Sequence, residues 1–309
     1  FFAKILNQGC LADPRYSTFA PQSEIDLIEN WWRRGGYNEI GQNVVERQRT
    51  LLELAKARVS NLSQPIFLSR LSTINHLDAL RVDGILQDAR EGISVRFTHD
   101  IFFEWAFFYV LTEASPQWMD IIKNCGEPPA VARVVELISQ WEYTRGNDWG
   151  ACLEKLKCAE LRSQWLRAWL LGPLGTSEFD ASDALFASTT FIDDFYLFKK
   201  VLVWFQAEKT IPNSNVMSGI VPHEHLMRMA YFLAWPADFA AWRRLIGFII
   251  RRIQEIPQRL YPEIVSIFEV WQNALASYKN PTSHAILKQC SAWLSSVDED
   301  EREEWFKNP

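Results

Sequence analysis

One change in hydrophobic spacing restricts the fold of this chain more than any other feature. In the segments before Gly84, apolar side chains recur every three or four residues, which is the period of amphipathic helices. In GILQDAREGISVRF the period shortens to that of β-strands, and two short strands are expected, around residues 85–87 and 93–97. Gly92 lies between them and suits the turn of a β-hairpin.

The stretch SEIDLIENWWRRGG predicts a helix with clear limits. Ser23 is suited to accept hydrogen bonds from the first free backbone N–H groups, and Glu24 and Asp26 suit the positive end of the helix dipole. Gly35 and Gly36 can adopt the backbone conformations that end a helix. We therefore expect one helix between the serine and the two glycines.

Residues 44–62 have the period of an amphipathic helix with one core face. The expected core positions are Val45, Leu52, Ala55, Val59 and Leu62. A second helix can begin at Pro65, because proline is tolerated in a first helical turn, and a third, in HLDALRVD, ends at Gly84. Three helices followed by a β-hairpin are the plan of a winged helix, which we predict for residues 44–114.

After Leu111 the chain is expected to be helical to its end, with interruptions at prolines. Tryptophan recurs in helix-like segments at irregular intervals, at positions 141, 169, 204, 242, 271 and 293. Such spacing resembles degenerate helical-hairpin repeats more than a strict repeat. The predicted fold is therefore mainly α: a winged-helix domain followed by an α-helical repeat-like domain, either an α-solenoid or a compact helical domain, over residues 115–309.

Charge and cysteine content exclude several classes of protein. A net charge of −6 disfavours a dominant nucleic-acid surface, which needs clustered lysine and arginine. The acidic run DEDEREE at residues 298–304 is typical of a solvated helix face or tail. The five cysteines are scattered without a CxxC pair, which indicates neither a disulfide framework nor a zinc site and favours a cytoplasmic location. No apolar run is long enough to span a bilayer, so we expect no membrane segment.

Two stretches resemble catalytic motifs but lack their context or spacing. TTFIDDF places Asp193 and Asp194 after an apolar run, but no phosphate-binding loop precedes them, and a helix start or helix surface is the simpler interpretation. VPHEHLM holds His223, Glu224 and His225, yet a zinc protease needs HExxH so that both histidines share one helix face. We expect no metal site and no independent active site.

The stretch VRFTHDIFFEWAFFYVL holds the strongest candidate for a binding site. Thr98 is expected to cap a helix that starts at His99, so that His99 and Asp100 lie in its first turn, where free N–H groups attract anions. There His99 can donate a hydrogen bond to a phosphate, while Asp100 holds the ring or the backbone in place. A capped helix start with a satisfied histidine explains the same residues without any ligand.

THDIFFEWAFFYVL, preceded by DGIL and VRF, resembles the winged-helix element of STAND-class signalling NTPases, the group that contains the NACHT and NB-ARC proteins. SEIDLIENWWRRGG and ERQRTLLELA are similar to the linker and first winged-helix segment of bacterial members, so the resemblance covers about residues 1–112. In that group a histidine at the strand-to-helix junction, often followed by aspartate, contacts the β-phosphate of ADP and holds the inactive state. The resemblance implies a nucleotide-binding role for His99, with Asp100 and Thr98 beside it. Thr98 replaces the methionine common in plant members.

The resemblance implies a regulatory chain rather than a complete enzyme. No glycine is followed by lysine, so the GxxxxGK[ST] loop is absent and this chain alone is not expected to hydrolyse ATP. The first residue, Phe1, is not a methionine, and we expect a longer parent polypeptide that binds ADP or ATP with magnesium. Residues 1–43 would be a helical linker and the end of the upstream NTPase module, residues 44–114 the winged helix, and residues 115–309 the sensor. The implied partners are the upstream NTPase domain, a protein trigger and further copies of the chain on activation, in bacterial defence signalling.

Two other functions stay open on the sequence. A winged-helix module joined to helical repeats can serve as an adaptor or scaffold that binds no nucleotide. A transcription regulator would read DNA through HLDALRVD. That helix carries Asp78 and Asp83 against Arg81, so we expect no nucleic-acid partner.

Overall fold

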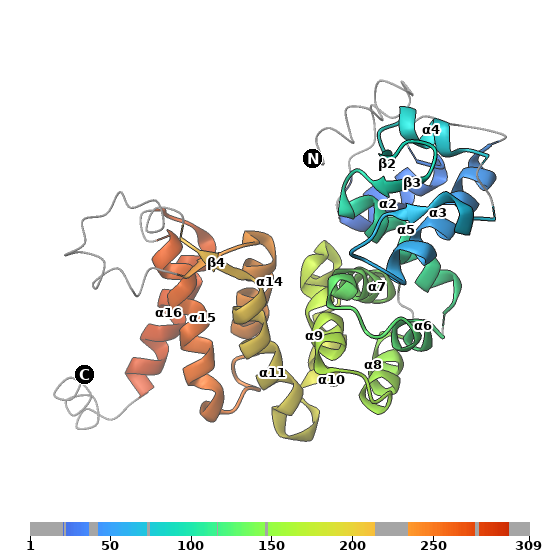
Figure 1. The fold of residues 1–309 in the computed structure, drawn as a ribbon. Helices are drawn as coiled ribbons and strands as arrows, with labels where there is room; N and C mark the ends of the chain where they lie inside the picture. Colours follow the sequence, from blue (N-terminus) through green and yellow to red (C-terminus); the bar gives the residue numbers. More distant parts are fainter. Residues whose placement is uncertain are drawn as a thin grey trace. The chain divides into compact units, whose positions relative to one another are not determined.

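The computed structural model describes residues 21, 23–36, 43–72, 75–115, 117–145, 148–213, 234–275 and 278–296. These residues are mainly α-helical, with two small antiparallel sheets (Figure 1). The chain divides after Ser177 into two compact units, each with its own core. The expected division into residues 1–43, 44–114 and 115–309 stays a prediction. None of the helices within the described ranges is long and apolar enough to cross a lipid bilayer.

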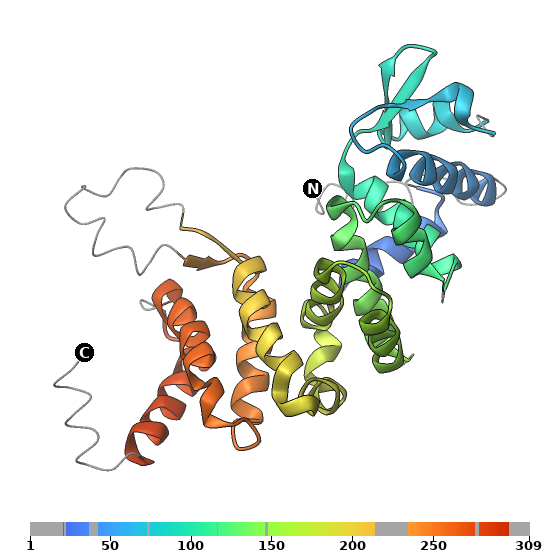
Figure 2. The ribbon, with the colours of Figure 1, turned by 60° about the horizontal axis from the view of Figure 1, so that its bottom comes forward.

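The first unit begins with a helix, a small sheet module and a long apolar helix. These elements are α2 (Glu24–Arg33), α3 (Val44–Val59), β1 (Ile66–Phe67), the 3-10 turn η2 (Leu68–Arg70), α4 (Leu77–Val82), β2 (Leu86–Arg90), β3 (Ser94–Phe97) and α5 (Asp100–Glu113). The sheet is antiparallel with the order β1-β3-β2, and Ile66 lies opposite Val95 while Leu86 lies opposite Phe97. Figure 2 shows the β2–β3 hairpin, coloured between cyan and green, from another side.

Helix α2 begins and ends where the sequence predicts. Ser23 Oγ accepts a hydrogen bond from the Asp26 N–H at 3.3 Å, and the Asp26 carboxylate accepts one from the Ser23 N–H at 3.0 Å, which is a capping box. At the other end Gly36 has a φ of +110°. A Cβ added there would lie 2.7 Å from Ile85 Cδ1, so a residue with a side chain would clash at this position and glycine is required.

The helix expected at Pro65 is absent, and that prediction is wrong. Residues 66–67 instead form β1, which pairs with β3, and only the short turn η2 follows. Pro65 marks the entry to an extended segment because the backbone groups after it bond to a strand that is distant in sequence. The prediction of α4 and of its end near Gly84 is confirmed, since this glycine has a φ of +73°.

The core face expected for α3 is partly wrong as well. Val45 is 55% exposed, whereas Leu51 and Leu54 are fully buried. Ala55 and Val59 are buried as predicted. The buried face is therefore turned relative to the expected one, because the partners of α3 decide which of several apolar stripes faces inward.

Helix α5 is the centre of the first unit. It is apolar on almost all sides, as a helix surrounded by other elements must be, and both α3 and α7 (Ala132–Thr144) pack against it. The Trp31 ring of α2 stacks on Phe102 at 6.0 Å between ring centroids and meets Trp105 edge-on at 5.5 Å. Helix α5 therefore contacts elements that lie on both sides of it in the sequence.

The remainder of the first unit is helical. Its elements are α6 (Trp118–Asn124), the turn η3 (Pro129–Val131), α7, α8 (Trp149–Cys158), α9 (Ser163–Leu171) and the turn η4 (Gly172–Gly175). α7 packs against α9 and η4. The buried Trp169 ring stacks with Trp118 at 5.7 Å and with Trp149 at 6.4 Å, so tryptophans anchor these helices to each other.

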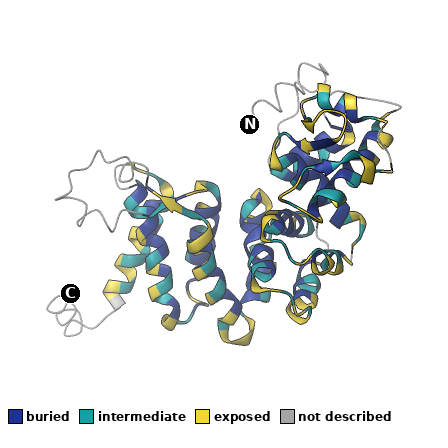
Figure 3. Ribbon diagram, in the orientation of Figure 1, coloured by how far each residue is buried: buried dark blue, intermediate teal, exposed yellow. Residues whose placement is uncertain are grey.

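The second unit contains helices and a two-stranded sheet. Its elements are η5 (Ser177–Asp180), which starts at the division, α10 (Asp183–Thr190), α11 (Ile192–Glu208), β4 (Thr210–Pro212), β5 (Ala234–Pro236), α14 (Phe239–Arg251), η7 (Gln258–Leu260), α15 (Tyr261–Leu275) and α16 (Pro281–Ser296). Phe179, Phe186 and Phe248 form an aromatic cluster in its core. Apart from the central α5, most helices in each unit have a buried and an exposed face (Figure 3). The β4–β5 pair is an exception to the predicted all-helical remainder.

Candidate functional site

The three residues predicted to bind a phosphate lie together at the start of α5. β3 ends at the buried Phe97, Thr98 is half-buried, and His99 and Asp100 are exposed. The strand is held in the sheet and the helix is held in the core, so the short junction between them is fixed from both sides. The predicted residues therefore share one well-defined surface position.

Thr98 is not the helix cap that we expected. Its Oγ1 donates a hydrogen bond to the backbone oxygen of Gly84 at 2.6 Å, with the Ile85 oxygen also within 3.2 Å, and its N–H donates to Ile85 at 2.9 Å. His99 takes the cap position with an extended backbone, and α5 begins at Asp100. The hydroxyl instead fastens the end of β3 to the turn after α4, so Thr98 positions the junction.

His99 presents its ring at the amino end of α5. The side chain makes no capping hydrogen bond to the first turn, and the ring lies 6.1 Å from the Phe102 ring between centroids. A helix of 14 residues directs the positive end of its dipole at this position. The Asp100 carboxylate offsets part of that charge. An anion at this point is attracted by the helix end and the imidazole and repelled by one carboxylate.

A polar pocket of about 450 Å³ adjoins the junction. Arg58 at the end of α3, Arg96 on β3 and Asp100 line it. Arg58 donates through Nη1 to the Gln64 backbone oxygen at 2.8 Å, which holds its guanidinium in place, and Arg96 is exposed. His99 does not line this pocket. Two guanidinium groups against one carboxylate give the pocket a positive lining beside the histidine.

The sequence did not predict these two arginines as a pair. In VRF, the alternation places Arg96 on the strand face opposite the buried Val95 and Phe97, which by itself indicates only a solvated face. Arg58 lies at the basic end of a helix, a common position for arginine. Their meeting depends on the packing of α3 against the sheet, and no local pattern carries that information.

The buried part of α5 is tied to two other helices by the Arg133 network, which we define as Glu24, Glu104, Trp105 and Arg133. Trp105 Nε1 donates to Glu24 Oε1 at 3.0 Å, Arg133 Nε lies 3.1 Å from Glu104 Oε2, and Arg133 also pairs with Glu24. Burial raises the pKa of the Glu104 carboxyl, Arg133 opposes this shift, and the net pKa is raised. The network joins α2, α5 and α7.

The other end of α2 is held by the Arg47 pair, which we define as Arg47 and Asp83. Their side chains are 1% and 5% exposed and form an ion pair. Arg47 Nε also donates to the Gly35 backbone oxygen at 2.6 Å. One cation therefore holds the end of α2, the helix α3 and the end of α4 together.

The surface of α4 does not have the charge of a DNA-reading helix. Arg81 pairs with Asp78 at 2.5 Å and with Asp88 at 2.8 Å, so two carboxylates compensate the one arginine of this helix. Asp83, which the sequence placed on the same surface, is buried in the Arg47 pair. Backbone phosphates would find no excess positive charge on α4.

The other stretches singled out in the sequence add no site. Asp193 and Asp194 are exposed, and Asp194 pairs with Arg259. Their backbone is left-handed, with φ of 51° and 57°, so they form a kink before the regular part of α11 rather than the expected helix start. The VPHEHLM motif lies outside the described residues. Within the described part of the chain, no group of three or more histidines, cysteines and acids is arranged to hold a metal ion.

Comparisons with known proteins assign no family or function to the chain. No family model matches the chain, and no curated protein is significantly similar to it.

Proposed function

We propose that residues 44–114 form a winged helix that reports the nucleotide state of a STAND-class signalling NTPase. The element order α3, β1, α4, β2 and β3 supports this proposal, as does the antiparallel strand order β1-β3-β2, which is the connectivity of winged helices. The turn η2 stands where such domains have their second helix. The junction to α5 then corresponds to the position at which the family resemblance implies a phosphate-sensing histidine.

The placement of His99 is the observation that carries the proposal. His99 is exposed at the amino end of α5, while most of the same helix is buried and bound to α2 and α7 through the Arg133 network. A phosphate that binds His99 therefore acts on a helix that runs through the core of the unit. A switch needs this combination, because its ligand must bias an element on whose position other parts depend.

The proposed ligand is ADP or ATP with magnesium, bound in the parent polypeptide. The residues present fit an anionic group, since the imidazole of His99, the amino end of α5 and the guanidinium groups of Arg58 and Arg96 all favour negative charge. The phosphate-binding loop and the magnesium ligands would come from the upstream NTPase domain. No residue of this chain is proposed to be catalytic.

We further propose that the helices after α5 bind a protein trigger. Helix α7 belongs to this part and also to the Arg133 network, so a partner that displaces α7 acts on α5 as well. Nucleotide and trigger would then bias the same element from two sites, which is the condition for allosteric coupling. A cytoplasmic location, assembly of several copies on activation and a role in bacterial defence extend the family resemblance.

The test is the nucleotide retained by the full parent polypeptide, extracted after purification and quantified per protein molecule. A charge-assisted hydrogen bond contributes roughly 1.5–3 kcal/mol, so we expect His99→Ala to weaken retention of ADP by roughly ten- to a hundredfold. His76→Ala is the matched control, because His76 lies in the same module and bonds Glu46 at 2.8 Å. This control should leave the nucleotide content unchanged.

Equal ADP retention by the native protein and the His99→Ala variant would contradict the proposal. A native protein that holds no nucleotide at all would favour the adaptor or scaffold function instead.

A further inference from the structure

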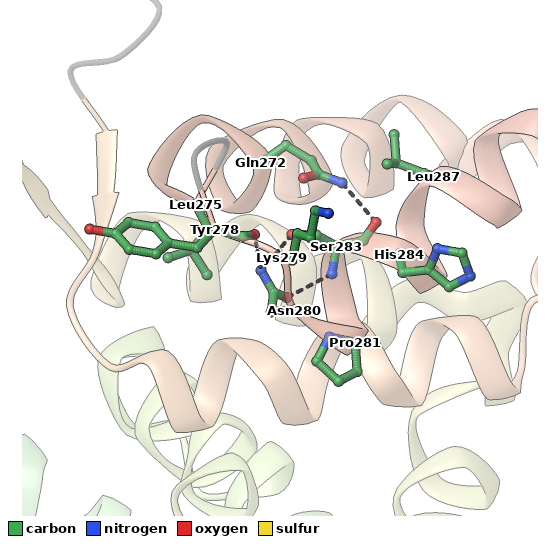
Figure 4. A pocket seen from close by; sticks show the side chains of 9 residues that line it. All are labelled: Gln272, Leu275, Tyr278, Lys279, Asn280, Pro281, Ser283, His284 and Leu287. Carbon is green, nitrogen blue, oxygen red and sulfur yellow. Dashed lines mark hydrogen bonds between the residues drawn. The ribbon is translucent and has the colours of Figure 1, made fainter.

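A second open surface lies in the second unit, between the end of α15 and the start of α16. A pocket of about 760 Å³ occupies this place, and its lining is mainly apolar (Figure 4). Leu275, Tyr278 and Leu287 supply much of that surface. Tyr278 is 68% exposed and Leu287 is 60% exposed, so both side chains are available to another molecule.

The floor of this groove is a turn held by hydrogen bonds. Asn280 Oδ1 accepts from the Ser283 N–H at 2.8 Å, which caps α16, and Pro281 suits the first position of that helix. Gln272 of α15 donates to the Ser283 backbone oxygen at 3.0 Å, and Trp271 Nε1 donates to Ser283 Oγ at 3.2 Å. Figure 4 shows Gln272, Asn280 and Ser283 turned to one another. These hydrogen bonds satisfy many of the polar groups of the floor.

The charge around the groove has one sign. Lys279 is the cationic residue of the lining, which also holds the imidazole of His284 and the phenol of Tyr278, and no carboxylate belongs to it. Lys288, one turn after His284 on α16, is exposed as well. Glu269 lies one turn before Gln272 on α15 and is outside the lining. The groove thus combines an apolar centre with a cationic rim, which complements a segment of negative charge.

The outer face of α16 extends the apolar surface. Leu294 follows Leu287 by seven residues, so both lie on one face of the helix, and both are exposed. The neighbouring face carries the buried Ile286, and α16 packs on α14 and α15. An apolar pocket continued by leucines at this spacing is typical of grooves that bind a short amphipathic segment.

We propose that this groove binds an acidic segment with bulky apolar side chains, presented by the protein that triggers the switch. The apolar side chains of the segment would cover Tyr278 and Leu287, and its carboxylates would face Lys279, His284 and Lys288. The identification of the occupant as the trigger rests on the proposed function. The chemistry of the occupant rests on the groove alone.

The test is binding of a labelled peptide to the full chain, measured by fluorescence anisotropy. The probe is the peptide VDEDEREEWFKNP, the sequence of residues 297–309, because it combines an acidic run with two adjacent aromatic residues. We expect Leu287→Ser and Lys279→Glu each to weaken its binding, by roughly tenfold, the effect of a side chain worth about 1.4 kcal/mol. Both positions are on the surface, so the fold should be unaffected.

Two matched controls accompany these variants. Val265→Ser removes an exposed aliphatic side chain from another part of α15, and Lys155→Glu makes the same charge change on α8 of the first unit. Neither should change the affinity. Absence of peptide binding, or binding that is insensitive to Leu287→Ser and Lys279→Glu, would overturn the proposal.

The same peptide and a chain shortened to end at Ser296 identify the occupant. Equal affinity of the full and shortened chains supports a groove that is open to a partner. Binding to the shortened chain alone would mean that residues 297–309 occupy the groove, and the proposal of a partner would fail. His99→Ala should bind the peptide like the native chain, so failure here is distinct from failure of the nucleotide test.

Discussion

Helix α2 is held at its two ends in different ways. At its carboxyl end the Arg47 pair is almost completely buried, with side chains 1% and 5% exposed. At its amino end Arg133 is 48% exposed, while the carboxylates with which it pairs, Glu24 and Glu104, are 17% and 16% exposed. When one partner of a buried pair is lost, the other charge is left uncompensated, whereas an exposed pair can exchange its partner for water at little cost. The first contact is therefore the more costly to break, and the second is the one that water reaches through Arg133.

The difference indicates which parts of the first unit can move separately. The Arg47 pair keeps the carboxyl end of α2 with α3 and α4. The Arg133 network connects its amino end to α5 and α7, the helices on which the proposed nucleotide and trigger act. Trp31 near the carboxyl end of α2 also packs on Phe102 and Trp105 of α5, so the contact that a ligand could change at the lowest cost is the Arg133 pair with Glu24.

The largest effect is expected at the buried end. Asp83→Asn keeps the shape of the side chain but leaves the Arg47 guanidinium without its countercharge, and we expect a loss of roughly 3–5 kcal/mol in the free energy of unfolding. Urea titration followed by tryptophan fluorescence measures this loss. Asp78→Asn is the control, because that aspartate is 96% exposed, and its effect should stay within about 0.5 kcal/mol. If Asp83→Asn and Asp78→Asn lower the free energy of unfolding by similar amounts, the buried Arg47 pair does not stabilise the carboxyl end of α2 more than an exposed pair does.

A smaller effect is expected at the exposed end. Arg133→Gln removes the ion pairs to Glu24 and Glu104, while the hydrogen bond from Trp105 to Glu24 can persist. We expect a loss of roughly 1–3 kcal/mol, below that of Asp83→Asn, because water reaches Arg133 while the Glu24 and Glu104 carboxylates are only 17% and 16% exposed. The control Lys157→Gln removes a surface pair with Glu154 within a single helix. If Arg133→Gln lowers the free energy of unfolding as much as Asp83→Asn does, the Arg133 network stabilises the protein as strongly as the buried Arg47 pair, and the comparison fails.

The smallest effect concerns the pH dependence of the Arg133 network. The pKa of Glu104 is raised from its ordinary value of 4.5, mainly by burial, so the folded state binds this proton more tightly than the unfolded chain. The stability contributed by the protonated form is present below that value and is lost as the pH rises through the raised pKa. Glu104→Gln should therefore gain stability relative to the native chain as the pH rises above about 4.5, until it passes the raised pKa of Glu104. Unfolding titrations at several pH values measure this trend, and a constant difference would contradict it.

The elements that could be predicted from the sequence are those whose determinants are local. Ser23 and Asp26 cap α2 within four residues, and Gly84 ends the turn after α4 through its own backbone conformation. The wrong predictions concern contacts between distant residues. Pro65 leads into a strand because of a partner near Val95, and the Thr98 hydroxyl bonds to the far side of the hairpin rather than to the next helix.

The candidate site was predicted in the same incomplete way. The position of His99 follows from a strand that runs into a helix, a pattern visible in one stretch of sequence. Arg58 and Arg96 reach the neighbouring pocket from separate elements, and Arg133 reaches α5 from a helix that follows it. The contacts of these arginines depend on how distant elements pack. The residues next to them in the sequence do not distinguish them from ordinary surface arginines.

The two attachments of α2 also differ in how far apart their residues lie along the chain. Arg47 and Gly35, which follows α2, are separated by 12 positions, whereas Glu24 and Arg133 are separated by 109. Closing the longer loop costs about 2 kcal/mol more in conformational entropy. During refolding we therefore expect the carboxyl end of α2 to reach its partners first, and its amino end to dock only after α7 has formed.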